Sequence, residues 1–201
     1  AIYIKYKEHL DEEQCCNLGY MYRNERGTTK DYSQAFYWYK KAAEAGNSDG
    51  MNGLANRYYN GEGTTKDYNL AFYWYKKSAE AGNSLGMNNL GYMYETGKEV
   101  AQDDAQAFYW YKKAAEAGND VAMNNLAICY YNGKGTTLDY KQAFYWFKKA
   151  AEAGNSKGMN NLGIMYQKGE GTPKDLTQAR YWYKKACDAG YEKGCDNLKN
   201  L

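Results

Sequence analysis

The chain has 201 residues, of which 44% are hydrophobic and 25% are charged. This balance excludes an intrinsically disordered chain, because such chains combine few hydrophobic residues with a high net charge. The formal net charge is only +2, so we expect no nucleic-acid partner. No apolar run approaches the length of a bilayer-spanning helix, so we expect no membrane insertion.

Three kinds of residue recur every 36 residues, which is the distance from Trp38 to Trp74. They are the tryptophans Trp38, Trp74, Trp110, Trp146 and Trp182, the glycines Gly46, Gly82, Gly118, Gly154 and Gly190, and the leucines Leu18, Leu54, Leu90, Leu126, Leu162 and Leu198. A period of this length indicates stacked supersecondary units, each unable to bury its apolar face alone.

The expected elements form a single repeat domain over residues 1–201. Residues 1–11 align with the end of a second helix of a unit, so we expect an N-terminal helix there. Five helix pairs follow, and residues 191–201 align with a first helix that caps the array. The pairs are expected at 12–47, 48–83, 84–119, 120–155 and 156–190.

Each unit is expected to contain two helices. In the unit 48–83 the apolar spacing predicts a first helix that Gly61 ends, and a second helix that starts after Asp67 and stops at Gly82. An aspartate is expected to cap each second helix, paired reciprocally with a glutamine three residues later. The aspartates are Asp31, Asp67, Asp103, Asp139 and Asp175, and the glutamines are Gln34, Gln106, Gln142 and Gln178. With no strand-like alternation anywhere, the expected fold class is all-α.

One unit carries the sequence Leu90-Gly91-x-x-Tyr94, and the units share Gly-x-Gly, Asp, Ala, Trp-Tyr and Lys-Ala-Ala-Glu-x-Gly-Asn. This pattern resembles the Sel1-like repeat, a relative of the tetratricopeptide repeat, over nearly the whole chain. The resemblance implies a right-handed α/α superhelical solenoid whose first helices line a concave face. It also implies an adaptor or scaffold, in bacteria often in signalling or host contact.

The first helices carry two ladders of asparagine. Asparagine is a poor residue for a helix interior, so the ladders cost stability in each unit. Amides that offer both donors and acceptors suit the backbone of an extended peptide, which predicts a protein or peptide partner. The predicted peptide-binding residues are Asn17, Asn52, Asn56, Asn88, Asn89, Asn124, Asn125, Asn160, Asn161 and Asn197, with variable neighbours Tyr59, Tyr92, Tyr131 and Lys157. Two alternatives remain open: the amides bond between adjacent first helices, or duplication copied them.

Two cysteines depart from the repeat pattern. Cys187 stands where other second helices have alanine, and Cys195 where other first helices have methionine. Both are expected to face one core within bonding distance, as in the cysteine-rich Sel1-like proteins of Helicobacter that this pair resembles. A disulfide and two buried thiols both remain open. A bridge would favour a periplasmic or secreted protein, and reduced cysteines a cytoplasmic one. Cys129 is expected in the core.

The second helices carry runs of four aromatic residues at 36–39, 72–75, 108–111 and 144–147. Four consecutive residues of a helix point in four directions, so some must be buried and others exposed. We interpret the runs as packing between second helices, and the outer aromatics as a potential oligomer contact. Gly61-Glu-Gly63 and its copies are interpreted as turns between helices, because no strand precedes them.

Catalysis has little material in this sequence. The only histidine is His9, which excludes multi-histidine metal sites, and we expect no metal and no cofactor. Some Helicobacter relatives have been credited with penicillin binding or β-lactamase activity, so the resemblance implies that alternative. The serines lack the Ser-x-x-Lys arrangement of such enzymes; they are Ser33, Ser48, Ser78, Ser84 and Ser156. A structural spacer is the third hypothesis, after the protein-binding scaffold and the enzyme.

Overall fold

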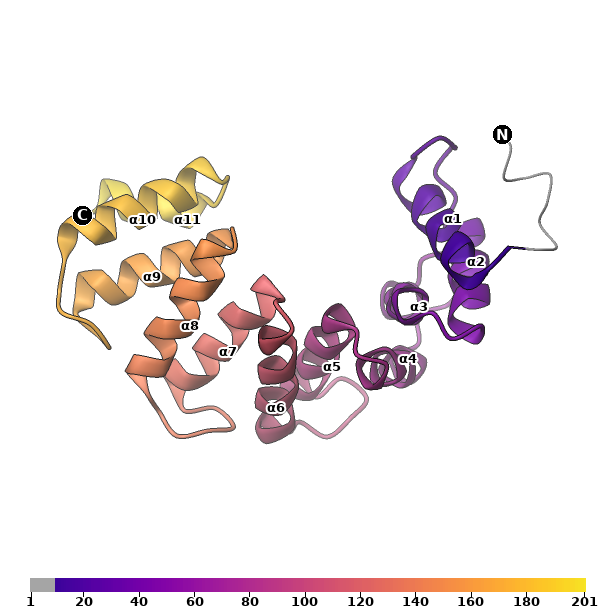
Figure 1. Cartoon of the computed structure of the whole chain (residues 1–201), viewed down its shortest axis with the longest axis horizontal. Helices are drawn as coiled ribbons and strands as arrows, with labels where there is room; N and C mark the ends of the chain where they lie inside the picture. Colours follow the sequence, from indigo (N-terminus) through magenta and orange to yellow (C-terminus); the bar gives the residue numbers. More distant parts are fainter. Residues whose placement is uncertain (1–9) are drawn as a thin grey trace. The chain divides into compact units, whose positions relative to one another are not determined.

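The computed structural model of the chain describes residues 10–201 (Figure 1). All regular elements within these residues are α-helices, so the expected fold class is confirmed. In chain order they are α1 (Glu12–Asn24), α2 (Tyr32–Glu44), α3 (Ser48–Asn60), α4 (Tyr68–Glu80), α5 (Ser84–Thr96), α6 (Asp104–Glu116), α7 (Asp120–Asn132), α8 (Tyr140–Glu152), α9 (Ser156–Lys168), α10 (Leu176–Asp188) and α11 (Glu192–Lys199).

The expected N-terminal helix falls almost wholly on residues 1–9, which include His9 and lie outside the described residues. Leu10 and Asp11 precede α1 and are not helical. Over residues 10–201, no helix is both long enough and apolar enough to cross a bilayer.

The chain divides into two compact units after Gln102. The first unit contains α1 to α5, and the second contains α6 to α11. Within each unit consecutive first helices pack on one another: α1 on α3, α3 on α5, and α7 on α9. We call the surface made by α1, α3 and α5, or by α7, α9 and α11, the first-helix face of its unit.

Local hydrogen bonds explain where the helices begin. The predicted aspartate caps are confirmed: the Asp67 carboxylate, for example, accepts a hydrogen bond from the Leu70 backbone N–H at 2.9 Å. The predicted reciprocal bond, in which the glutamine side chain accepts from the N–H of the aspartate, is not formed in the second helices. In the described part of the chain the complete capping box is formed at Asp11 and Gln14 of α1, a pair that the sequence reading did not include. In each second helix the aspartate side chain accepts from the N–H group three residues later.

The Ala-Gly-Asn sequence joins one repeat to the next with a single short turn. Gly46 adopts φ +99°, which favours glycine because it has no Cβ. The Gly46 and Asn47 N–H groups donate back to the Ala43 and Ala42 carbonyls and close α2. The Asn47 side chain then accepts a hydrogen bond from the Gly50 N–H and caps α3. One residue therefore ends a second helix and starts the next first helix, which keeps the period constant.

The second glycine of the Gly-x-Gly turn lies against the preceding repeat. A Cβ on Gly63 would overlap the Tyr32 carbonyl group at the start of α2, and Gly171 lies in the same way on Tyr140. The turn interpretation is consistent with this geometry, since these glycines permit close packing between repeats.

The aromatic runs divide between core and surface as four successive helical directions require. In the first run Tyr39 is buried, and Tyr37 is 47% exposed. Phe36 makes an edge-on contact with Tyr58 of the following first helix, with ring centroids 5.4 Å apart. The packing is thus partly against first helices and not only between second helices, whereas Trp74 packs on the core cluster of α2 and α3.

Candidate functional site

Each first-helix face has a repeated site at the junction of two consecutive first helices. A side chain from the intervening second helix forms the floor of each junction. The floor residues are Tyr39, Tyr75, Phe147 and Tyr183, and all four are buried. Because these positions are separated by multiples of the repeat, the four junctions can be compared residue by residue.

At two junctions the hydroxyl of the floor tyrosine donates a hydrogen bond to a side chain of a first helix, which closes the junction. Between α3 and α5, the Tyr75 hydroxyl donates to the Asn56 side-chain oxygen at 2.8 Å. Between α9 and α11, the Tyr183 hydroxyl donates to the Gln167 side-chain oxygen at 2.6 Å. Burial raises the pKa of Tyr183 to about 12, so this hydroxyl keeps its proton at neutral pH and remains a donor.

The α1/α3 junction holds an open pocket of about 310 Å³. We call it the polar pocket; it is lined by Cys16, Asn17, Tyr20, Arg23, Tyr39, Asp49, Asn52, Gly53, Asn56 and Leu85. Gly53 interrupts the asparagine ladder at this junction, and the Tyr39 ring lies where a Cβ on Gly53 would be. Cations, carboxylates and amides together make this pocket suited to polar side chains and to peptide backbone.

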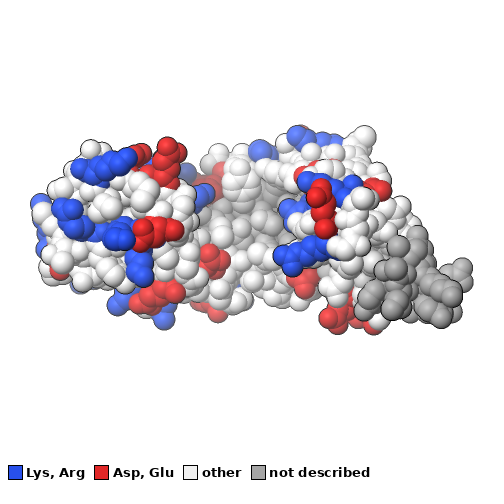
Figure 2. Space-filling view, turned by 90° about the horizontal axis from the view of Figure 1, so that it is seen from above, with Lys and Arg blue, Asp and Glu red and all other residues white. Residues whose placement is uncertain are grey.

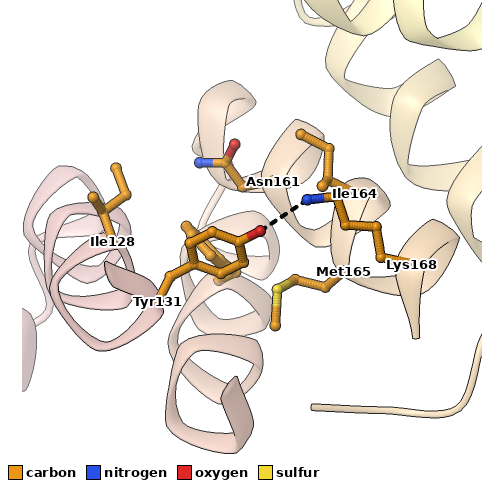
Figure 3. A pocket seen from close by; sticks show the side chains of 7 residues that line it. Ile128, Tyr131, Asn161, Ile164, Met165 and Lys168 are labelled. Atoms are coloured by element: carbon orange, nitrogen blue, oxygen red, sulfur yellow. Dashed lines mark hydrogen bonds between the residues drawn. The ribbon is translucent and has the colours of Figure 1, made fainter. Parts of the chain in front are cut away.

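The α7/α9 junction holds a pocket of about 250 Å³, which we call the apolar pocket. It is lined by Ile128, Tyr131, Phe147, Asn161, Ile164, Met165 and Lys168. Figure 3 shows Ile128 and Ile164 on either side of Tyr131, with Met165 and Lys168 beside its ring. The two pockets occupy equivalent positions in different repeats, yet one is lined by polar groups and the other mainly by hydrocarbon.

A lysine contacts the tyrosine at the end of the preceding first helix in both units. The Lys98 ammonium donates to the Tyr59 hydroxyl at 2.7 Å, and the Lys168 ammonium donates to the Tyr131 hydroxyl at 2.9 Å. These hydrogen bonds raise the pKa of each lysine, so both ammonium groups stay charged at neutral pH. The two lysines do not occupy equivalent repeat positions, since Lys98 follows α5 and Lys168 is the last residue of α9. Each nevertheless contacts the tyrosine at the same position of its repeat.

The asparagine ladders join adjacent first helices. The Asn89 amide donates to the Asn52 oxygen at 2.9 Å, and Asn161 donates to Asn124 at 3.0 Å. Asn197 donates to Asn160 in the same way, at 2.8 Å. The three acceptors Asn52, Asn124 and Asn160 are at most 8% exposed. These bonds correspond to the alternative in which the amides hold the stack together.

A peptide-binding role stays a prediction for the ladder members that retain surface. Asn17 is exposed and, with Asn56, lines the polar pocket, and Asn161 lines the apolar pocket. Asn88 and Asn125 are half-buried. The buried acceptor asparagines present almost no surface to a partner protein. Any contact between a partner and the ladder would therefore come mainly from the donor asparagines.

The cysteines fall into two groups. Cys187 in α10 and Cys195 in α11 are joined by a disulfide, with their Cα atoms 4.6 Å apart. Cys15 and Cys129 are buried free thiols, so the core position expected for Cys129 is confirmed. Cys16 borders the polar pocket, but burial and the Asp49 carboxylate raise the pKa of its thiol to about 11. A thiol that is protonated at neutral pH is a weak nucleophile.

The charged surface is mixed. Figure 2 shows lysines and arginines beside aspartates and glutamates. Lys76 and Glu80, for example, lie 3.9 Å apart and are about half exposed. No group of three or more potential metal-binding side chains occurs within residues 10–201. The charge pattern therefore singles out neither pocket as a strongly charged site.

The repeat pattern is shared with known proteins. The sequence profile of the Sel1 repeat matches residues 15–47, 48–83, 84–119, 120–155 and 156–191. The chain belongs to the Sel1 repeat family. Sel1 repeats form solenoids, mediate protein–protein interactions and are generally scaffolds without enzymatic activity.

Solved Sel1 structures resemble the chain. A protective antigen of uropathogenic Escherichia coli strains is 37% identical, with a TM-score of 0.82, over 94% of this chain and 41% of the antigen. A Sel1 repeat protein from Oxalobacter formigenes is 32% identical, with a TM-score of 0.89, over 96% of this chain and 79% of that protein.

The resemblance to the cysteine-rich relatives is also found. Helicobacter pylori cysteine rich protein B is 29% identical, with a TM-score of 0.53, over 64% of this chain and 92% of that protein. Comparison with curated proteins gave no match. This chain thus spans less than half of the Escherichia coli antigen but most of the Helicobacter protein.

Sequence reasoning missed the residues that distinguish the two pockets. Phe147 departs from the tyrosine found at its position in the other repeats, and Ile128 stands at a position whose residue varies between repeats; these two features were the available signal. Among the expected variable neighbours, Tyr131 lines the apolar pocket, whereas Tyr59 and Tyr92 pack on one another with ring centroids 6.5 Å apart. Lys157 is exposed at the start of α9.

Proposed function

We propose that this Sel1 repeat chain binds an extended segment of a partner protein on its first-helix face. The observation that supports this proposal is the presence of two open pockets at equivalent inter-helix junctions, one in each unit. A pocket between two first helices suits an extended segment, which can insert a side chain into the pocket while its backbone stays at the rim. The exposed amide of Asn17 would contact that backbone.

No observation favours the alternative functions to the same degree. A β-lactamase or penicillin-binding activity needs an activated nucleophile, and the Cys16 thiol at the polar pocket is protonated at neutral pH. A pure spacer requires no open pockets on either face. Self-association through the outer tyrosines remains a separate prediction; in the structure Lys41 lies over the exposed Tyr37 ring, 5.3 Å from its centroid.

The test uses a matched pair of surface tyrosines. Tyr20 borders the polar pocket and is 44% exposed, whereas Tyr181 lies on a second helix and is 50% exposed. Ligands are selected from a displayed library of random extended peptides on the full chain, and their affinity is measured by fluorescence anisotropy. We expect Tyr20→Ala to weaken binding by about tenfold, as for an interface anchor, and Tyr181→Ala to leave it unchanged.

Two results would contradict the proposal. If the library gave no ligand for the full chain, the spacer hypothesis would be preferred. If Tyr181→Ala weakened binding as much as Tyr20→Ala, the binding surface would not be the first-helix face. Circular dichroism of both variants serves as the control for folding, since neither tyrosine is buried.

A further inference from the structure

The apolar pocket combines the one phenylalanine at the floor position of the repeats with an isoleucine at a variable position. At the α3/α5 junction the equivalent residues are Asn56 and Tyr75, which form a hydrogen bond. At the α7/α9 junction these positions hold Ile128 and Phe147. Both partners of that part-buried hydrogen bond thus have hydrocarbon counterparts here, so no unsatisfied donor or acceptor is present.

The side chain at the rim also differs between the two junctions, and in the apolar pocket it comes from the same repeat position as Ile128. At the α3/α5 junction Tyr92 packs edge-on near Tyr59, with ring centroids 6.5 Å apart. The residue equivalent to Tyr92 is Ile164 at the α7/α9 junction, where it lines the pocket. A smaller side chain at the rim and a floor without a hydroxyl leave a volume of about 250 Å³.

This volume suits one side chain and not a whole ligand. Cavities of about 150 Å³ lined by leucine, isoleucine and phenylalanine hold a benzene molecule, whereas drug-sized ligands need about 300–1,000 Å³. The surroundings of the pocket are hydrocarbon apart from the Tyr131 hydroxyl, the Asn161 amide and the Lys168 ammonium (Figure 3). The Asn161 amide already donates one hydrogen bond to Asn124.

The charge at the pocket is positive. Lys168 is the charged residue among those lining it, and its ammonium is held beside the Tyr131 hydroxyl. Glu170 lies 3.8 Å from the ammonium, but half of the Lys168 side chain is exposed. A carboxylate next to the inserted side chain would therefore meet a cation that is already ordered.

We propose that the apolar pocket takes a single aliphatic or aromatic side chain, of the size of leucine or phenylalanine, from a partner segment that carries an acidic residue beside it. This inference rests on the proposed function and adds the side-chain chemistry of the partner. The polar pocket of the first unit, with Arg23, Asp49 and Asn17 in its lining, has no such apolar preference.

The test measures peptide selectivity at the pocket directly. The probes are acetyl-Ala-Xaa-Asp-Ala-amide peptides with leucine, phenylalanine, alanine or asparagine at Xaa, and the readout is the methyl NMR signals of Ile128, Ile164 and Met165. We expect the leucine and phenylalanine peptides to bind about tenfold more tightly than the alanine peptide, because of the extra apolar area buried.

Two variants fill the pocket with groups already found in this chain. Ile128→Asn with Phe147→Tyr recreates the Asn56–Tyr75 pair, and Ile164→Tyr recreates the residue at position 92. Each is expected to abolish the leucine preference, and a retained thermal transition shows that the fold is kept. Lys168→Gln is expected to lower affinity for the acidic peptide about threefold at low salt and to have no effect at high salt.

Equal binding of the leucine and asparagine peptides would overturn this proposal, as would undiminished leucine binding by both filled variants. If displayed ligands still depended on Tyr20 in that case, the proposed function would stand without the apolar pocket. A dimer that forms in the wild type and is lost in the filled variants would place a second copy in the pocket and also overturn the proposal.

Discussion

Arg57 is the most unusual single residue of the core. It occupies the position held by Met21, Met93, Cys129 and Met165 in other repeats, and its side chain is fully buried. Its guanidinium lies near the Tyr32 and Tyr39 rings, with centroid distances of 5.8 and 5.9 Å. One nitrogen lies 2.7 Å from a Glu62 oxygen, an ion pair at an angle outside the range of a directional hydrogen bond. Burial lowers the pKa of Arg57, which reflects the cost of removing its charge from water.

This geometry predicts that substitutions of Arg57 and of Glu62 have opposite effects on the free energy of unfolding. Arg57→Met puts the common residue of the other repeats into the core, and we expect the free energy of unfolding to stay equal or to rise by about 1 kcal/mol. Glu62→Gln leaves a buried charge without its counter-charge and is expected to cost about 3 kcal/mol. Urea denaturation of both variants measures these changes.

The double variant Arg57→Met with Glu62→Lys provides the control, because it reproduces the residues Met93 and Lys98 of the next repeat. It should be at least as stable as the wild type. If Arg57→Met alone were strongly destabilising, the buried pair would contribute more than its desolvation costs, and the comparison with the methionines would not hold.

At the scale of helices, the asparagine hydrogen bonds fasten one first helix to the next. Asn161→Ala removes the donor and leaves the buried Asn124 oxygen unsatisfied, so we expect a loss of about 1–2 kcal/mol in the free energy of unfolding. Asn124→Ala with Asn161→Ala removes both partners and should cost less than the sum of the single variants.

Asn17→Ala is the matched control, because Asn17 is exposed at the end of the ladder. We expect no change in its melting temperature. Because alanine favours a helix more than asparagine does, helix propensity cannot produce a loss, and an equal loss for Asn17→Ala and Asn161→Ala would mean that the bond between helices does not set the effect.

At the scale of the whole chain, stability is expected to vary along the array. In repeat proteins each unit is stabilised mainly by its neighbours, so a terminal helix with one neighbour frays first. The eight-residue helix α11 packs on α10, and the disulfide from Cys195 ties the two helices together. Closing such a short loop contributes about 2–3 kcal/mol in the chain-entropy description.

Reduction of this bridge should therefore act locally. We expect faster amide hydrogen exchange in α11 after reduction or in Cys195→Ser, with exchange in α7 and α8 unchanged. Mass spectrometry after alkylation of the unfolded protein should count three free thiols before reduction and five afterwards. Five thiols before reduction would show that the pair is not bridged.

Short-range chemistry explains why so much of the fold could be predicted. The 36-residue period, the two helices per unit, the aspartate caps and the left-handed glycines all depend on residues within one or two turns of each other. The reciprocal glutamine bond failed because the N–H of the capping aspartate already donates to a carbonyl of the preceding first helix, as Asp31 does to Tyr22 at 3.0 Å and Asp139 to Tyr130 at 2.9 Å.

The sequence by itself determined the all-α repeat architecture, because each unit repeats the same local signals and its apolar faces require a neighbour. Which atoms meet between the helices of neighbouring repeats was decided only by the tertiary structure. Asn52 and Asn89 bond to each other, and Ile128, Ile164 and Phe147 surround an open volume. Such contacts join residues from different helices, and their outcome depends on the packing of whole side chains in three dimensions, which periodicity along the chain does not encode.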